Sequence, residues 1–107
     1  MNALTAMQIG VRAMKDSDLL SAERMFRSVC FDRGAADKVR TDALHLLCHC
    51  MDRRGLWHQS ESEAMRVHHF WDEQRQRERT TMRNVVVGVV GLLAVVAVGR
   101  GLRARAA

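Results

Sequence analysis

The sequence predicts an all-α protein in which a small helical domain precedes one C-terminal transmembrane helix. The chain of 107 residues has no Pro, and no segment alternates apolar and polar residues as a half-buried strand would. Apolar residues recur instead at spacings of three and four, which is the period of an amphipathic helix. Near the C-terminus an uninterrupted apolar run replaces this pattern, as is typical of a membrane span.

The first two expected helices lie before residue 35. One apolar face on a helix over residues 2–15 is formed by Leu4, Met7, Val11 and Met14. We expect Ser17 to cap the second helix, because its hydroxyl can accept from a backbone N–H, and Gly34 to close it in the left-handed conformation. The buried face of this second helix would comprise Leu19, Ala22, Phe26, Val29 and Cys30.

Two further helices are expected. The third covers residues 37–52, with Gly55 just past its end and an apolar stripe of Val39, Ala43, Leu44, Leu47, Cys48 and Met51. In the fourth, Ser60 and Glu63 have the spacing of a capping box. Its apolar face would hold Ala64, Val67, His68 and Trp71, and Glu73 is spaced for an ion pair with Arg77. We expect this helix to continue, with room for a break near Thr80, into the apolar run.

The apolar run is short for a membrane span. Residues 85–99 carry no charge and no hydrogen-bonding side chain, and as a helix they would cover about 22 Å of the roughly 30 Å hydrocarbon core. Arg83 and Arg100 can extend their aliphatic stems through the boundary, and Leu102 adds apolar surface. The alternative is a buried helix or a Val-rich strand. It is disfavoured because the run has no polar stripe and the chain offers no partner strands.

The charge pattern argues against a nucleic-acid partner. The formal net charge is +5, but the residues up to position 84 hold 14 basic and 12 acidic side chains. The excess is therefore concentrated after the run, so no phosphate-binding surface is predicted. The basic residues that flank the predicted span are Arg83, Arg100, Arg103 and Arg105.

Topology and compartment follow from the ends of the chain and from its Cys residues. Residues 1–15 lack the basic region and continuous apolar core of a secretory signal, although their amphipathic pattern leaves a mitochondrial presequence as an alternative. A span this late in the sequence would be inserted after translation, which predicts a tail anchor with the helical domain in the cytosol. The three Cys residues, an odd number within apolar patterns, suit buried thiols in a reducing compartment.

Residues 3–36 resemble a tetratricopeptide repeat (TPR). Gly10, Ala22 and Phe26 occupy the positions of that repeat's small and aromatic residues, where small side chains let two helices approach and Phe26 fills the gap. Ala6 and Ala13 replace the usual aromatic residues, so the match is partial. Residues 37–75 keep the helical pair but little of the consensus. An unrelated four-helix arrangement is the alternative.

The layout resembles the mitochondrial fission protein 1 family, and equally a small subunit of the outer-membrane protein translocase. Both pair helical hairpins with a short Gly-containing tail anchor and basic flanks. The resemblance implies a TPR-like helical domain (1–72), a polar helical connector (73–83), a transmembrane tail anchor (84–102) and a basic C-terminal tail (103–107). It also implies the mitochondrial outer membrane as the location, consistent with sorting by membrane thickness.

The sequence predicts neither a catalytic site nor a metal site. On one helix face His45, Cys48, His49 and Asp52 are weak candidates for a zinc site, but no second ligand pair accompanies them, so surface His and a structural Cys are favoured. His68 and His69 offer either a binding patch or one packed and one solvated ring. No nucleophile, base and orienting group can be placed together. We therefore expect no catalysis, no metal and no cofactor.

The predicted span also carries small residues. Gly88, Gly91, Ala94, Ala97 and Gly99 would allow another helix to come close, although small residues can also serve only to lower hydrophobicity for targeting. The sequence favours a non-catalytic adaptor or accessory subunit of an outer-membrane translocase that takes part in protein import. Its expected partners are the bilayer, proteins of a membrane complex and an amphipathic peptide segment. The alternatives are a fission adaptor and a single-span subunit of an inner-membrane respiratory or ATP synthase complex.

Overall fold

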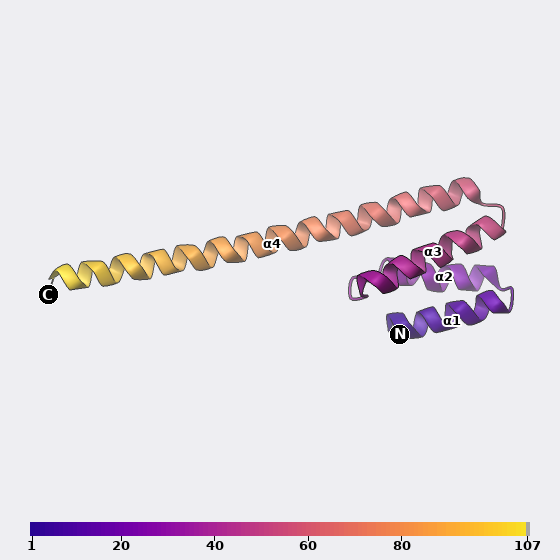
Figure 1. Ribbon diagram of the computed structural model, residues 1–107, viewed down its shortest axis with the longest axis horizontal. Coiled ribbons are helices and arrows are strands. Elements are labelled where there is room, and N and C mark those ends of the chain that lie inside the picture. The colour runs from indigo at the N-terminus through magenta and orange to yellow at the C-terminus, as the bar shows by residue number, and fades with distance from the viewer. Residues whose placement is uncertain (107) are drawn as a thin grey trace. The chain divides into compact units, whose positions relative to one another are not determined.

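The computed structural model describes the backbone of residues 1–106 and the side chains of residues 1–100. Its described residues form α1 (Ala3–Lys15), α2 (Leu19–Cys30), α3 (Asp37–Arg53) and α4 (Trp57–Ala106) (Figure 1). The all-α prediction is confirmed: three packed short helices precede a long apolar C-terminal helix. The chain divides into two units, Met1–Asp72 and Glu73–Ala107, and α4 contributes to both.

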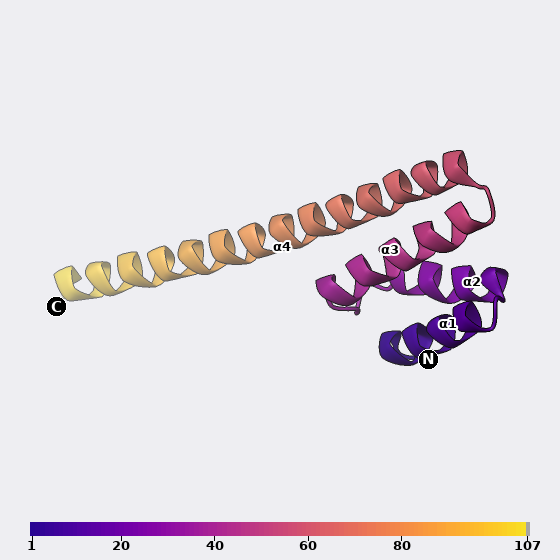
Figure 2. The ribbon, with the colours of Figure 1, turned by 45° about the vertical axis from the view of Figure 1, so that its right-hand side comes forward.

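Within the first unit, the short helices lie side by side (Figure 2), and the beginning of α4 completes their core. Phe26, Leu47 and Val67 are fully buried, one from each of α2, α3 and α4. Removing a large apolar side chain from water stabilises the fold by about 1.5–3 kcal/mol. The buried core comprises Ala6, Ala22, Phe26, Val29, Cys30, Ala43, Leu44, Leu47, Cys50, Met51, Val67 and Trp71.

The approach of α1 to α2 depends on Gly10. A Cβ atom at this position would lie 2.6 Å from Cε1 of Phe26, closer than van der Waals contact allows. The Phe26 ring therefore occupies the space that a side chain at residue 10 would need. The close approach expected from the small residue at position 10 and the aromatic residue at position 26 is present.

The turns after α1 and α3 have the same hydrogen-bonding pattern. After α3, Gly55 has φ +77°, and the N–H of Leu56 donates to the carbonyl of Met51 at 2.9 Å. After α1, the residue with positive φ is Ser17, at 61°, and the N–H of Asp18 donates to Ala13 at 2.8 Å. Both are Schellman motifs, which satisfy the last carbonyls of a helix.

The predicted cap at Ser17 was wrong because that residue is taken up by the preceding turn. Asp18 is the N-cap of α2, and its side chain accepts from the N–H of Ser21. Hydrogen bonding to this N-cap also lowers the pKa of the Asp18 carboxyl. Gly34 does not close α2 either, since the helix ends at Cys30. The Gly34 N–H instead donates to Asp32 Oδ1 at 2.9 Å.

The predicted capping box at Ser60 and Glu63 was also wrong. The left-handed turn at Gly55 lets the next helix start at once, and α4 begins at Trp57. Ser60 and Glu63 therefore lie inside the helix, and both are buried. The possible break near Thr80 is absent, since α4 continues through it and the adjacent Thr81 hydroxyl donates to the Arg77 carbonyl at 2.9 Å.

We predict that Gly10→Ala lowers the free energy of unfolding by about 1–3 kcal/mol, although Ala is the better helix former by about 1 kcal/mol. The reason is the overlap with the Phe26 ring. Denaturant unfolding of the full chain in detergent would measure the loss. In a Phe26→Leu background the same substitution should cost far less, and equal costs in the two backgrounds would contradict the overlap.

We predict that Ser17→Gly raises the free energy of unfolding by about 0.5–1 kcal/mol, because Gly adopts positive φ without the steric cost that Ser incurs. The same denaturant titration measures this gain. Ser28→Gly is the matched control, since Ser28 is an exposed residue within α2 and should lose stability there. A loss in both variants would refute the role assigned to Ser17.

Candidate functional site

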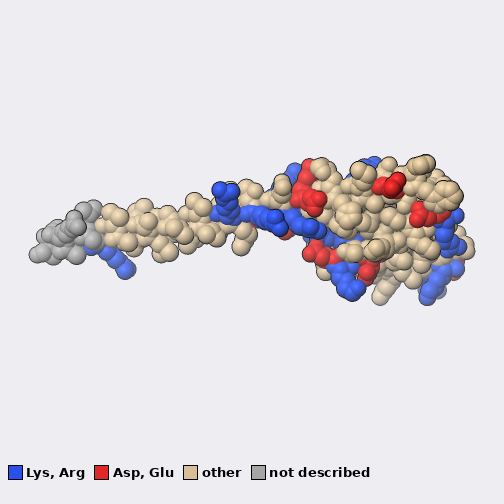
Figure 3. Space-filling model, turned by 45° about the horizontal axis from the view of Figure 1, so that its top comes forward, with Lys and Arg blue, Asp and Glu red and all other residues tan. Residues whose placement is uncertain are grey.

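The apolar part of α4 is uncovered within the described chain. It is long and apolar enough to cross a membrane by length and composition, and none of it is buried. Even Val96, the least exposed of its large apolar side chains, is 45% exposed. Figure 3 shows this part as a stretch free of charged side chains, with Lys or Arg on both sides. Such a continuous apolar surface is costly in water.

The large apolar side chains of this segment are Val85, Val86, Val87, Val89, Val90, Leu92, Leu93, Val95, Val96 and Val98. They occupy every side of the helix, since successive residues turn by about 100°. A soluble amphipathic helix keeps one polar face. The arrangement therefore fits a helix surrounded by apolar material.

Three of the predicted small-residue positions have open space beside them. A Cβ atom at Gly88, Gly91 or Gly99 would meet nothing within 4 Å, so none of the described residues packs there. On an ideal helix Gly99 lies about 20° from Gly88 and Gly91 about 60° from it. The three glycines therefore share a sector of about 80° and form a strip of low relief, whereas Ala94 and Ala97 lie about 120° and 180° from Gly88. The partner helix expected on this strip stays a prediction.

Arginines bound the apolar segment on both sides. Arg83 and Arg100 are described, and the residues between them carry no charge. The predicted flanking residues Arg103 and Arg105, together with Leu102, lie outside the described side chains. A guanidinium at each end can stay hydrated while its aliphatic stem covers apolar surface.

The weak metal candidates do not converge. His45, His49 and Asp52 are exposed on α3, whereas Cys48 is half-buried with its Sγ 3.9 Å from the Ser60 carbonyl oxygen of α4. Among the residues that the structure describes, no three or more His, Cys, Asp or Glu side chains form a group able to hold a metal ion.

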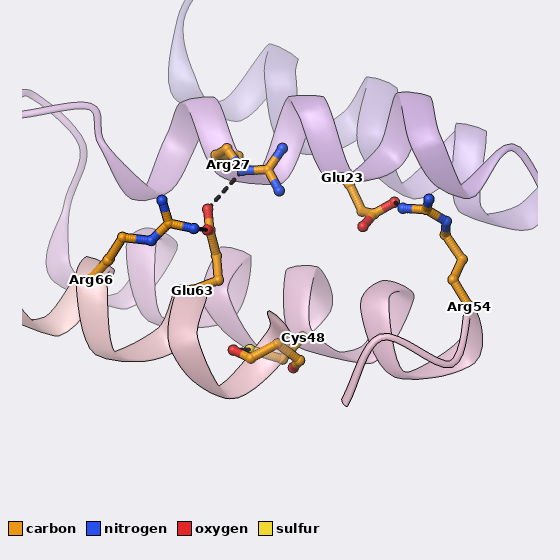
Figure 4. Close-up of polar contacts among 7 residues, drawn as sticks. Glu23, Arg27, Cys48, Arg54, Glu63 and Arg66 are labelled. Carbon is orange, nitrogen blue, oxygen red and sulfur yellow. Dashed lines mark hydrogen bonds and ion pairs between the residues drawn. The ribbon is translucent and has the colours of Figure 1, made fainter. Parts of the chain in front are cut away.

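Two buried carboxylates, which the sequence did not reveal, link the helices of the first unit. Glu23 of α2 is 3% exposed and accepts from Arg54 at 2.5 Å. Glu63 of α4, 4% exposed, accepts from Arg27 Nε at 2.7 Å and from Arg66 at 2.6 Å (Figure 4). Each pair across helices joins residues more than 30 positions apart. The one sign of these buried carboxylates in the sequence is that each Glu is in register with the apolar face of its helix.

These ion pairs have a structural role. Removing an arginine would leave a buried carboxylate uncompensated, which costs about 3–5 kcal/mol for a fully buried pair and less here, because the arginine ends are partly exposed to solvent. A hollow of about 520 Å³ lies beside them, lined also by Met51, Leu56, His58, Gln59 and Ser62. The arginines there are already bound to carboxylates, so the arrangement locks α2 to α3 and α4.

The residues at the end of this unit pack around Trp71. Its indole N–H donates to the Cys30 carbonyl at 2.7 Å, which satisfies a carbonyl of the last turn of α2. The His68 ring meets Trp71 edge-on at 5.2 Å between centroids, although His68 and His69 are both exposed. Trp71 therefore has a packing role, and the two His residues lie at the exposed edge of this packing.

A shallow hollow of about 560 Å³ runs along α1. It is lined by Met7, Gln8, Val11, Arg12, Lys15 and Asp16, which follow one stripe of the helix. Its floor is apolar and its rim carries two cations and one carboxylate. Leu4, on the same side of this helix, is 64% exposed. On the described surface of the first unit, α1 thus presents partly exposed apolar side chains.

Comparison with protein-family models, with characterised proteins and with solved structures gives no match. The resemblance in layout to the two kinds of outer-membrane protein named above therefore stays a prediction. What the chain does is inferred from its own residues and their geometry.

The buried thiols predict a loss of stability in alkali. Burial raises the pKa of the Cys30 thiol from 9.0 to about 12, and burial also raises the pKa of Cys50. Above about pH 9 the unfolded chain loses the thiol proton that the folded chain retains. The free energy of unfolding must therefore fall as the pH rises from about 9 towards 12.

Between pH 8 and pH 10 under reducing conditions, the wild type should lose about 1.4 kcal/mol more of its free energy of unfolding than Cys30→Ala. The chain has no Tyr, which removes one competing alkaline titration. Denaturant titrations at the two pH values measure the difference. Parallel losses in the two proteins would show that Cys30 ionises equally in both states.

Proposed function

We propose that this protein is a non-catalytic, tail-anchored adaptor or accessory subunit on the cytosolic face of the mitochondrial outer membrane, acting in protein import. The observation that carries the proposal is the uncovered apolar segment of α4 between Arg83 and Arg100. Its exposed Val and Leu side chains have no cover within the described chain, and a bilayer would supply it. The helical unit would then be held beside the membrane.

The helical unit suits an adaptor better than an enzyme. Its buried polar groups Glu23 and Glu63 are bound to arginines that join helices. A feature of the described unit that can receive a ligand is the hollow along α1, where Met7 and Val11 form the floor and Arg12 and Lys15 belong to the rim. An amphipathic helix laid in this hollow would bury its own apolar face.

The choice of membrane rests on the length and flanks of the span. An uncharged run of residues 85–99 covers less than the average hydrocarbon thickness, and short spans are disfavoured in the thicker membranes of the secretory route. Arginines on both sides fit anchors delivered to mitochondria. Import is preferred to fission because a small import subunit requires a helical unit and an anchor and nothing else.

Protease treatment of intact mitochondria that carry the full chain with an N-terminal epitope tests this proposal. Loss of the epitope while the outer membrane is intact is the expected result. Survival until both membranes are opened would instead support an accessory subunit of an inner-membrane complex. If the epitope faces the cytosol, depletion of the protein followed by import assays on isolated mitochondria separates an import role from a fission role.

We predict that Gly88→Leu combined with Gly91→Leu removes the protein from its membrane complex, because the larger side chains hold a partner helix away from the strip. Native gel electrophoresis should show at least a fivefold loss of the assembled form, with the protein still resistant to alkaline extraction. Val86→Leu combined with Val90→Leu is the control, since these residues lie on the side of the helix opposite the three glycines. Equal assembly of all three proteins would contradict the packing role.

A further inference from the structure

The polar stretch of α4 before the apolar segment has two unlike faces. Arg75, Arg79 and Arg83 are spaced by four residues, so on the continuous helix they fall within a sector of about 80°. Arg75, Glu78, Arg79 and Met82 line one surface hollow. Glu73, Gln76, Arg77, Thr80 and Thr81 line another, and these residues lie on the other side of the helix.

The arginine face is strongly basic. Residues 75–83 contain four Arg and one Glu, and three of those Arg lie on this face. Met82 lies about 20° from Arg75 around the axis and is 64% exposed. Cations mixed with an exposed apolar side chain are typical of a helix surface that meets the boundary between hydrocarbon and headgroups. The opposite face carries neutral side chains together with Glu73 and Arg77, which are spaced for an ion pair.

The distance from the apolar segment places this face at headgroup depth. With a rise of 1.5 Å per residue, Arg83 and Arg79 lie about 3 Å and 9 Å along the axis from Val85, and Arg75 about 15 Å. The headgroup layer of each leaflet is about 5–8 Å thick. Arg83 therefore lies within it, and Arg79 reaches back into it with its flexible stem. Arg75 lies beyond the layer along the axis, so only its extended guanidinium can approach the outer edge.

We propose that Arg75, Arg79 and Arg83 form a binding face for the phosphate groups of anionic phospholipids in the leaflet that α4 enters. The inference rests on the membrane span proposed above. A guanidinium donates two parallel hydrogen bonds to phosphate oxygens, which an ammonium cannot do. Juxtamembrane basic residues gain from the negative surface potential of an anionic leaflet. The face thus makes retention of the protein dependent on lipid composition as well as on apolar burial.

The test uses the full chain reconstituted in phosphatidylcholine vesicles that contain trace spin-labelled lipid. Electron paramagnetic resonance then compares the motionally restricted fraction of spin-labelled phosphatidylserine with that of spin-labelled phosphatidylcholine. We expect the anionic lipid to associate about fivefold more strongly per contacting arginine, and we expect the preference to weaken as salt increases.

Arg79→Gln and Arg77→Gln are a matched pair, because each removes one charge and they lie two residues apart on opposite faces. Arg79→Gln should reduce the anionic preference about fivefold and Arg77→Gln by less than twofold. Equal reductions would overturn the proposed face, since they would show a response to net charge only. Arg79→Lys should recover part of the preference, because the charge returns without the paired donors.

Two further outcomes separate this inference from the function on which it rests. If the protein restricts both labelled lipids equally, the span is inserted and only the lipid-binding face is overturned. If it restricts neither, the span itself is refuted. Inorganic phosphate at matched ionic strength should weaken the preference no more than chloride does, and a larger effect would assign the arginines to free phosphate instead.

Discussion

The structure depends on one physical constraint, the cost of leaving the apolar surface of α4 in water. Its Val and Leu side chains occupy every side of the helix, so no single neighbour in the chain could cover them. At about 25 cal/mol per Å², burial in hydrocarbon would be a large favourable free-energy term for the second unit. In a bilayer, the arginines on both sides would limit how far the helix can slide. The flanking polar stretch would thereby be held at the depth where headgroups lie.

The first unit meets a different constraint, because its core is small. A unit of 72 residues buries a modest share of its surface, so each close contact matters. Gly10 lets the Phe26 ring fill the space between α1 and α2. Glu23 and Glu63 join α2 to α3 and α4 through arginines, and buried pairs of this kind resist partial opening more than they add net stability. These contacts keep the unit well defined despite its small core.

The sequence was sufficient for the helices and insufficient for the details that need long-range contacts. Periodic apolar residues predicted α1 closely, and the charge-free run predicted the apolar end of α4, because both signals are local. Ser17 was misassigned because Gly usually occupies the position that Ser17 takes. The capping box failed since Gly55 starts the next helix earlier. The Arg27–Glu63 and Arg54–Glu23 pairs could not be predicted, because each joins helices whose packing the sequence does not specify.

Tryptic digestion of the full chain inserted into protein-free liposomes tests the central claim most directly. Arg75 and Arg100 offer the same cleavage chemistry on the two sides of the apolar segment. If this segment spans the bilayer, trypsin added outside should cut at Arg75 and leave Arg100 intact until detergent is added, as mass spectrometry of the protected peptide would show. Cleavage at both arginines in sealed liposomes would mean that α4 does not cross the membrane.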